Sequence, residues 1–464
     1  MKLSFRGRVV QIVAAAAMAL GAVGSAQAQQ SRLMANTANV DAATLSSNGQ
    51  AELNTLKANR RNLRVTAKHL DARVFNGNVV SIDVGTTTIR LVKQFTTVEA
   101  DGSTTWAGQQ DAYNSAVFSI KDGKVFGTIN TRNGTFQIQH VEGDTHAILE
   151  LDMSQQQPKD ESEDIPDGHG NQGSSLELQP QGGMSTQSLS TAATVANPPV
   201  RILVAYSAHA AAALGNQLSF QINQAIAQIN QANVNSNVTF RAALAGTIQV
   251  NYTGPYTASA ALAAFRVMPD VLAAHDSMQA DLMVMLEAIP ASAEAGLSTG
   301  INVTAANAFS VVSTAYMTSN LSFAHEVGHL MGADHPQPDT PNNVFRFGHG
   351  YWQWSLYSVL SPAAQCAHTI MAYAISQSNG VQPSVNGILP QCAPDPRIPY
   401  WSSPTVWANT GSGSPVIMGA TGTNDNAQVL NITGPLVTNF HSTVLGSRGG
   451  IGTPNCKTNP RLCA

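Results

Sequence analysis

The sequence predicts a mixed α/β (α+β) domain in the second half of the chain, preceded by a β-rich domain. Two patterns lead to this expectation. Between residues 63 and 151, short runs of alternating apolar and polar residues are separated by Asp122-Gly123 and Asn133-Gly134, and such pairs indicate β-hairpins. After residue 199, short apolar strands are followed by segments with helical spacing. A chain of 464 residues is long enough for roughly two to three domains.

The second half begins with an apolar strand at 201–206. In the segment 217–232, apolar residues recur at helical spacing, among them Leu218, Ile222 and Ile229. Further elements are expected as strands at 238–252, 281–286 and 309–316 and as helices within 259–278 and at 322–331. Together they predict a mixed twisted sheet with helices above a cleft. After residue 335, Pro, Asn, Gly and Ser become frequent, which predicts a smaller irregular lower subdomain.

The stretch from His325 to His335 has the pattern H-E-x-x-H-x-x-G-x-x-H. On a helix, residues four apart lie on the same face, so His325 and His329 can direct their imidazoles at one metal ion. Glu326 lies one step round the helix, where it can act as a general base on a water molecule without binding the metal. The pattern therefore predicts a zinc site that has its own base.

The third histidine requires a turn. If the helix continued, His335 would lie roughly 9 Å beyond His329 along the axis. Gly332 allows the chain to turn back, because glycine enters the left-handed conformation without a side-chain penalty. Three imidazoles with no cysteine nearby leave one position open, whereas structural zinc sites usually have four protein ligands. The alternative to a zinc site is a helix that carries these histidines by chance. In either case, Ser322 or Asn320 is expected to cap the helix that contains His325 and His329.

Thr369-Ile370-Met371-Ala372-Tyr373 follows the third histidine. With the zinc motif, this segment resembles the Met-turn of the metzincins, a group of zinc endopeptidases. The resemblance implies that Met371 forms a hydrophobic floor beneath the three imidazoles, although an ordinary core methionine is the alternative. Over residues 199–440 the chain is similar to the reprolysin-like (adamalysin-like) branch, as a bacterial-type member. The similarity is specific at the zinc motif and the Met-turn and loose elsewhere.

Two features depart from that branch. Pro336 follows the third histidine, where adamalysin-type enzymes usually have Asp. The Met-x-Tyr spacing of Met371 and Tyr373 resembles serralysins and astacins, in which a tyrosine can bind zinc at rest and later stabilise the oxyanion. The resemblance makes Tyr373 a candidate auxiliary group for zinc or oxyanion binding. A buried tyrosine with a local hydrogen bond is the alternative.

The resemblance implies a zinc-dependent endopeptidase that hydrolyses proteins or peptides, in which Glu326 takes a proton from water and delivers it to the leaving amine. A zinc amidase acting on cell-wall material and a catalytically inactive zinc-bearing binding protein are the alternatives. An edge strand within 305–313 is expected to pair with an extended substrate. Candidates for the wall of the pocket on the primed side, after the scissile bond, follow the Met-turn: Ile398, Pro399 and Tyr400.

The N-terminus predicts a secretory signal peptide at 1–28. Lys2, Arg6 and Arg8 precede an apolar run, and Ala26-Gln27-Ala28 provides a cleavage site of small residues. The apolar run is too short to favour a membrane anchor. Export to the extracellular space or the periplasm is therefore expected.

The β-rich segment 29–152 looks similar to the propeptides of reprolysin-like enzymes, although an unrelated β-rich domain kept in the mature protein is the alternative. Residues 153–198 carry an acidic run followed by Gly, Ser, Gln and Pro, which is typical of a flexible linker. Cleavage near the end of this linker would release a catalytic domain at 199–445, so we expect a zymogen. Residues 446–464 form a C-terminal tail.

Four cysteines lie after the zinc motif: Cys366, Cys392, Cys456 and Cys463. An even number in an exported chain favours disulfides, and pairing Cys366 with Cys392 and Cys456 with Cys463 closes the shortest loops. No cysteine precedes Cys366, so a propeptide thiolate cannot block the metal. Three linker residues are weaker candidates for that role, against the alternative of a solvated acidic linker: Asp164, Asp167 and His169.

Charged residues make up only 11% of the chain and the net charge is −4, so nothing indicates a nucleic-acid partner. Protein or peptide substrates are the expected partners, Zn²⁺ is the expected cofactor, and a monomer is expected.

Overall fold

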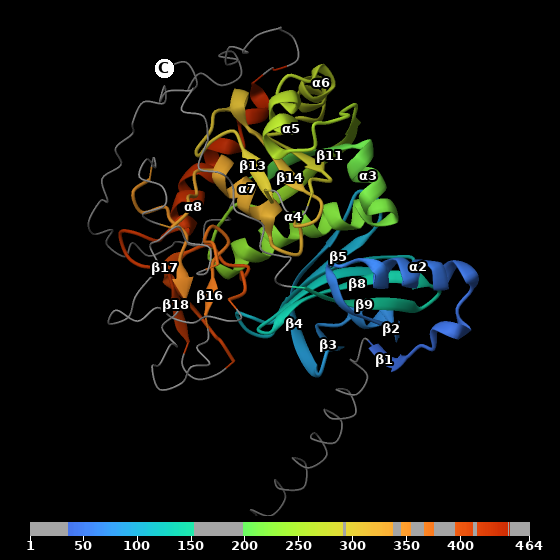
Figure 1. The fold of residues 1–464 in the computed structure, drawn as a ribbon. Helices are drawn as coiled ribbons and strands as arrows, with labels where there is room; N and C mark the ends of the chain where they lie inside the picture. The colour runs from blue at the N-terminus through green and yellow to red at the C-terminus, as the bar shows by residue number, and fades with distance from the viewer. Residues whose placement is uncertain are drawn as a thin grey trace, which may run out of the picture.

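The computed structural model describes residues 36–152, 198–290, 294–336, 345–353, 366–374, 395–411, 415–443 and 445. The expected signal peptide and C-terminal tail, and all but one residue of the expected linker, lie outside these ranges. An antiparallel sheet near the N-terminus and a mixed sheet after residue 198 lie on either side of the long helix α4 (Leu218–Asn235) (Figure 1). No helix in these ranges is both long and apolar enough to cross a bilayer.

The N-terminal sheet has nine antiparallel strands in the spatial order β1-β2-β9-β8-β7-β6-β5-β4-β3. Its strands are β1 (Asn36–Asn39), β2 (Asn62–Leu70), β3 (Val79–Val84), β4 (Thr87–Val98), β5 (Thr104–Gln109), β6 (Ser115–Lys121), β7 (Lys124–Thr131), β8 (Gly134–Glu142) and β9 (Thr145–Leu151). Asp122 and Gly123 turn the β6–β7 hairpin with φ of 52° and 77°, the left-handed values that a two-residue loop favours. Helix α2 (Ser47–Ala58) packs Leu53 and Leu56 against this sheet.

The second sheet has five strands in the order β11-β10-β12-β14-β13, and only β13 is antiparallel to its neighbour. The strands are β10 (Val200–Ser207), β11 (Ala242–Val250), β12 (Leu282–Glu287), β13 (Gly296–Ser298) and β14 (Phe309–Ser313). The helices around it are α3 (Ala208–Leu214), α4, α5 (Ala258–Phe265), α6 (Pro269–Met278) and α7 (Ser322–Leu330). All six residues of β12 are buried, as is typical of a parallel strand covered on both faces.

The edge of this sheet differs from the expectation. Strand β14 ends at Ser313 and lies between β12 and β13, so an extended substrate cannot pair with it. The edge strand on this side of the sheet is β13, and β11 forms the opposite edge. Strand β13 has only three residues and therefore shows no alternation that could reveal it. The prediction of an edge strand within 305–313 is wrong.

The described residues after 335 form four short strands and one longer helix. These are β15 (Trp352–Gln353), β16 (Ala367–His368), β17 (Ser403–Ala408), β18 (Val416–Met418) and helix α8 (Asn426–Val437). Short 3-10 helices complete the fold: η1 (Ala42–Thr44), η2 (Ala72–Asn76), η4 (Gly215–Gln217), η5 (Ala305–Asn307) and η7 (Phe440–Ser442).

Helix α4 is buried on both faces. Its apolar face contributes Ile222 and Ile229 to the core of the second sheet. Its polar face lies against the N-terminal sheet, where Asn223 Nδ2 donates to Ser103 Oγ at 3.0 Å and Gln231 Nε2 donates to Gln94 Oε1 at 2.8 Å. The helical spacing alone indicates a solvated polar face. The tertiary structure instead uses that face as a hydrogen-bonded contact with the N-terminal domain.

Candidate metal centre

Helix α7 carries the first two histidines and the glutamate of the zinc motif. Its N-cap is Leu321, which has a left-handed φ of 56° and makes no side-chain capping bond. The amide of Phe323 donates instead to Met317 O of the preceding turn, at 3.3 Å. The prediction that Ser322 or Asn320 caps this helix is therefore wrong, because neighbouring backbone satisfies the free amides.

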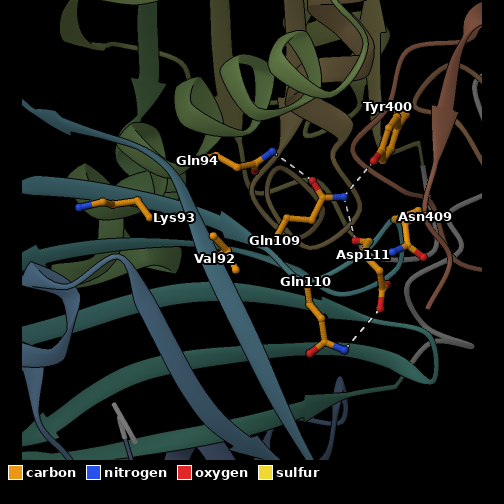
Figure 2. Close-up of a pocket in the computed structure, with 9 residues that line it drawn as sticks. Val92, Lys93, Gln94, Gln109, Gln110, Asp111, Tyr400 and Asn409 are labelled. Carbon is orange, nitrogen blue, oxygen red and sulfur yellow. Dashed lines mark hydrogen bonds between the residues drawn. The ribbon is translucent and has the colours of Figure 1, made fainter. Parts of the chain in front are cut away.

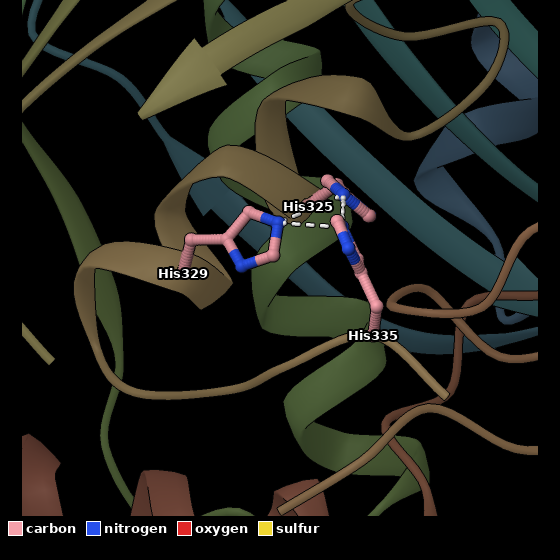
Figure 3. Close-up of side chains that lie close together, drawn as sticks. All are labelled: His325, His329 and His335. Carbon is pink, nitrogen blue, oxygen red and sulfur yellow. Dashed lines mark hydrogen bonds between the residues drawn. The ribbon is translucent and has the colours of Figure 1, made fainter. Parts of the chain in front are cut away.

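The three histidines meet at one point. Figure 3 shows their imidazoles converging, His325 and His329 from helix α7 and His335 from the chain that follows it. Nε2 of His325 lies 3.1 Å from Nε2 of His329 and 3.1 Å from Nε2 of His335, and the remaining pair is 2.9 Å apart. Ligand nitrogens at 2.0–2.1 Å from one tetrahedral Zn²⁺ would be about 3.4 Å apart. The set therefore fits a single small cation.

The contacts of the Nδ1 atoms show which nitrogen of two imidazoles carries the proton. His325 Nδ1 lies 2.8 Å from Ile370 O, and His329 Nδ1 lies 3.0 Å from Ala333 O. A carbonyl only accepts, so these Nδ1 atoms carry the protons. In neutral rings the Nε2 lone pairs then point at one another, an arrangement that is repulsive unless a cation lies between them.

Burial keeps these rings neutral. It lowers the pKa of His329 to about 4 and holds the pKa values of His325 and His335 well below the ordinary value for histidine. The positive charge of Arg397 lowers the pKa of all three in addition. Neutral imidazole is the form that binds metal, so the site is ready for an ion at neutral pH.

The turn after the helix orients one ligand and delivers another. Gly332 has a φ of +100°, a conformation that residues with a side chain rarely adopt. The amide of Ala333 donates to Gly328 O at 2.9 Å, and Ala333 O contacts His329 Nδ1. The same turn therefore orients the ring of His329 and brings His335 to the other two histidines.

Met371 lies beneath the helix and is fully buried. A Cβ added at Gly328 would lie 2.7 Å from Met371 Sδ, so this close contact requires a glycine on the helix between the two histidines. Ile370 O, one residue before the methionine, contacts His325. The segment around Met371 thus packs on helix α7 and contacts the ring of His325.

Glu326 is buried against the edge strand β13. Ser298 Oγ donates to Glu326 Oε2 at 2.6 Å and also lies 3.0 Å from Glu326 O. A Cβ at Gly296 would lie 2.6 Å from Glu326 Oε1. On strand β13, the hydroxyl of Ser298 therefore positions this carboxylate, and the missing side chain of Gly296 leaves room for it.

Comparison with known proteins decides the family. Residues 197–384 match the model of Metallo-peptidase family M12. The "Peptidyl-Asp metalloendopeptidase" of Stenotrophomonas maltophilia (strain K279a) is 30% identical over 333 residues, which are 70% of this chain and 70% of that protein. This chain belongs to the metzincin metallopeptidases. It is a zinc metalloendopeptidase.

Two further proteins resemble this metzincin. The "Peptidyl-Asp metalloendopeptidase" of Xanthomonas campestris pv. campestris is 30% identical over 334 residues, 69% of this chain and 68% of that protein. The solved structure of metalloproteinase-II from Bacteroides fragilis aligns with 57% of this chain and 83% of that chain, at 14% identity and a TM-score of 0.35.

Tyr373 of the metzincin lies at the histidine cluster. Its hydroxyl is 2.8 Å from Nε2 of His335 and 2.5 Å from Nδ1 of the same ring. The side chain is buried, and Trp352 Nε1 donates to Tyr373 O at 2.7 Å. The hydroxyl therefore lies beside the ring of the third histidine.

Sequence reasoning missed Arg397, a buried residue near the metzincin's histidines. Nη1 donates to Asn320 O at 3.0 Å, just before helix α7, and Nη2 donates to Ala372 O at 3.1 Å, just after Met371. Arg397 directly precedes Ile398, Pro399 and Tyr400, the candidates for the primed-side wall. Its positive charge is the only signal in the sequence that distinguishes it from these neighbours. Ser298 and Gly296 were missed as well, because nothing local links them to Glu326.

Of the nominated wall residues, Tyr400 faces the N-terminal domain. Its hydroxyl accepts a hydrogen bond from Gln109 Nε2 at 2.9 Å, and both side chains border a hollow of about 300 Å³ (Figure 2). Residues 92–94 and 109–112 of the N-terminal domain line most of this hollow, and none of the three histidines does. Ile398 is buried in an apolar cluster that joins residues after 366 to Ala112 and Tyr113 of the N-terminal domain.

Other polar residues of the lower part are in structural contacts. His349 Nδ1 lies 2.6 Å from His335 O, and His368 Nδ1 lies 3.1 Å from Asp395 Oδ1. Cys366 is buried and disulfide-bonded. The other three cysteines lie outside the described residues, so the two proposed pairings stay predictions.

Proposed function

We propose that this metzincin hydrolyses peptide bonds with Zn²⁺ bound by His325, His329 and His335 and with Glu326 as the general base. The observation that carries this proposal is the convergence of three Nε2 atoms at 2.9–3.1 Å. Two of these rings already use Nδ1 to contact backbone carbonyls. Such a set of lone pairs is stabilised by a cation and by little else.

The roles of the side chains follow from their positions. Bound zinc supplies Lewis-acid chemistry that polarises the scissile carbonyl and makes water more acidic. Glu326, held by Ser298, takes the proton from the attacking water and transfers it to the leaving nitrogen. We propose that the hydroxyl of Tyr373 donates a hydrogen bond to the oxyanion, because this hydroxyl lies beside the three histidines. The edge strand β13 offers backbone groups to an extended peptide.

The substrate preference comes from the relatives. Two proteins 30% identical to this chain carry the name peptidyl-Asp metalloendopeptidase. We propose that this metzincin also cleaves beside aspartate. The same matches favour peptide hydrolysis over a cell-wall amidase and over an inactive zinc-bearing binding protein.

We further propose that the protein is secreted through the signal peptide 1–28, to the extracellular space or the periplasm, as a monomeric zymogen. Residues 29–152 act as the propeptide, cleavage within 153–198 releases the catalytic domain, and a Cys366–Cys392 disulfide braces the Met-turn. The polar contact of helix α4 supports this scheme. Released Gln and Asn side chains can be solvated by water, so the exposed face stays soluble.

Casein degradation by the full chain, with any processing that it undergoes, tests the proposal. The parent protein should degrade casein and contain one zinc per chain, and a chelator should abolish the activity. Glu326→Ala should keep the zinc but lose at least 10²-fold in kcat. Turnover that survives this substitution contradicts the assignment of the base. Release of wall fragments without casein cleavage would support the amidase, and binding without turnover would support the inactive protein.

A further inference from the structure

We propose that Arg397 is the specificity-determining residue, which binds the side-chain carboxylate of an aspartate directly after the scissile bond. The inference rests on the proposed function, because it explains how the cleavage beside aspartate would be selected. It assigns this selection to one side chain that contacts the residue after Met371.

Arg397 is a buried cation with unused hydrogen-bonding capacity. Its side chain belongs to a residue that is 9% exposed, and two of its donors contact the carbonyls of Asn320 and Ala372. Nε has no hydrogen-bond partner, and no carboxylate of the described residues lies within ion-pair distance. A buried guanidinium without an anion is costly, whereas an incoming carboxylate would satisfy both its charge and its free donors.

The position of Arg397 fits a substrate side chain. Its two carbonyl contacts join the start of the zinc helix to the residue after Met371, so the guanidinium lies between two segments that border the metal site. The second contact is to the residue directly after Met371, and Ile370 O of the same segment contacts His325 Nδ1 at 2.8 Å. A substrate residue adjacent to the scissile bond must lie within a few ångströms of the same cluster.

The composition of the catalytic domain leaves few other candidates. Residues 199–445 contain no lysine and five arginines: Arg201, Arg241, Arg266, Arg346 and Arg397. Arg201 donates to the carbonyls of Gln279 and Met278, and Arg266 donates to Asn307 Oδ1. Arg241 lies over the ring of Phe95, and Arg346 is exposed. Arg397 is the buried arginine that contacts the Met-turn segment.

Peptide cleavage by matched variants tests the inference. Three peptides differ only in the residue after the scissile bond, which is Asp, Asn or Ala, and mass spectrometry identifies the bond that is cut. Arg397→Gln should lower kcat/KM for the Asp peptide about 100-fold, mainly through KM, because a site built for a polar group discriminates strongly. The Asn and Ala peptides should change less than threefold.

Arg201→Gln is the matched control, since it also removes an arginine that donates to two backbone carbonyls. It should leave the ratio of Asp to Asn cleavage unchanged. Arg397→Lys keeps the charge but loses the planar donor fork, and should retain a preference for Asp at least fivefold weaker than that of the parent. This variant decides the question if Arg397→Gln does not fold.

Binding provides a readout that does not depend on turnover. In the Glu326→Ala background, a fluorescent Asp peptide should bind about 100-fold more weakly once Arg397→Gln is added. An equal loss for all three peptides, which is expected of a purely structural brace, overturns the inference. So does an Asp preference that survives Arg397→Gln, or that applies to the residue before the scissile bond. A parent enzyme that cleaves none of the peptides or casein overturns the proposed function itself.

Discussion

Ser298 Oγ lies 2.6 Å from Oε2 of Glu326 and links the edge strand to the proposed general base. The two residues are 28 positions apart in the chain. A hydroxyl at this distance holds the carboxylate in one orientation, and proton transfer from water depends on that orientation.

Ser298→Ala should therefore lower kcat about tenfold, with little change in KM or in zinc content. Ser310→Ala is the control, because Ser310 pairs with Ser298 across strands β13 and β14 and its buried hydroxyl has no hydrogen-bond partner. Steady-state kinetics on one peptide, with metal analysis of each variant, makes the comparison. Equal effects of the two substitutions would contradict a positioning role.

The contact between Gly328 and Met371 predicts an effect on the metal site. Gly328→Ala places a Cβ 2.7 Å from Met371 Sδ and 3.0 Å from Trp401 Cζ3. Overpacking of this kind costs about 1–3 kcal/mol, so the melting temperature should fall and zinc should bind more weakly. Thermal unfolding and competition with a zinc chelator measure both effects. Adding Met371→Ala should give less than the sum of the two losses, and strict additivity would argue against the contact.

The hydroxyl of Tyr373 should matter in catalysis. Tyr373→Phe is expected to lower kcat about 10²-fold while KM changes little, because the loss falls on an oxyanion donor. Tyr252→Phe is the control, since the hydroxyl of Tyr252 donates to Pro255 O in another part of the catalytic domain. If Tyr373→Phe reduces the melting temperature but not kcat, its hydroxyl has only the local structural role.

His146 predicts how the stability of the precursor depends on pH. Its Nε2 accepts the amide proton of Val125 at 3.0 Å, and Nδ1 lies 2.9 Å from Asp144 O, so the folded site holds the neutral ring. Burial lowers its pKa from the ordinary 6.5 to about 4. As the pH falls from 6.5 to about 4, the unfolded chain takes up this proton and the folded chain does not, so stability decreases.

The loss attributable to His146 is roughly 3 kcal/mol across this window, at about 1.4 kcal/mol per pH unit. Urea unfolding of the full precursor at pH 7.5 and pH 4 measures it. His146→Gln, whose amide has no proton to gain, should reduce the difference between the two pH values. An unchanged difference would show that other groups cause the acid sensitivity.

Local sequence patterns predict several helices and strands of this protein. Where such a prediction fails, contacts with another part of the chain are the reason. Helix α4 was found by its spacing, but its polar face is buried because the N-terminal sheet covers it. The edge strand and the helix cap were predicted wrongly. The position of the edge strand and the capping of helix α7 depend on backbone of neighbouring segments, and not on the residues of the strand or helix itself.

The sequence by itself determined how the three histidines come together. The positions of His325, Glu326 and His329 follow from helical spacing, and Gly332 marks the turn that His335 requires, so each step depends on residues a few positions apart. Only the tertiary structure decided which groups orient them. Ile370 O, Ser298 and Arg397 make their contacts across 45, 28 and 77 positions of chain. No local periodicity encodes such distances, because they arise when separate elements pack together.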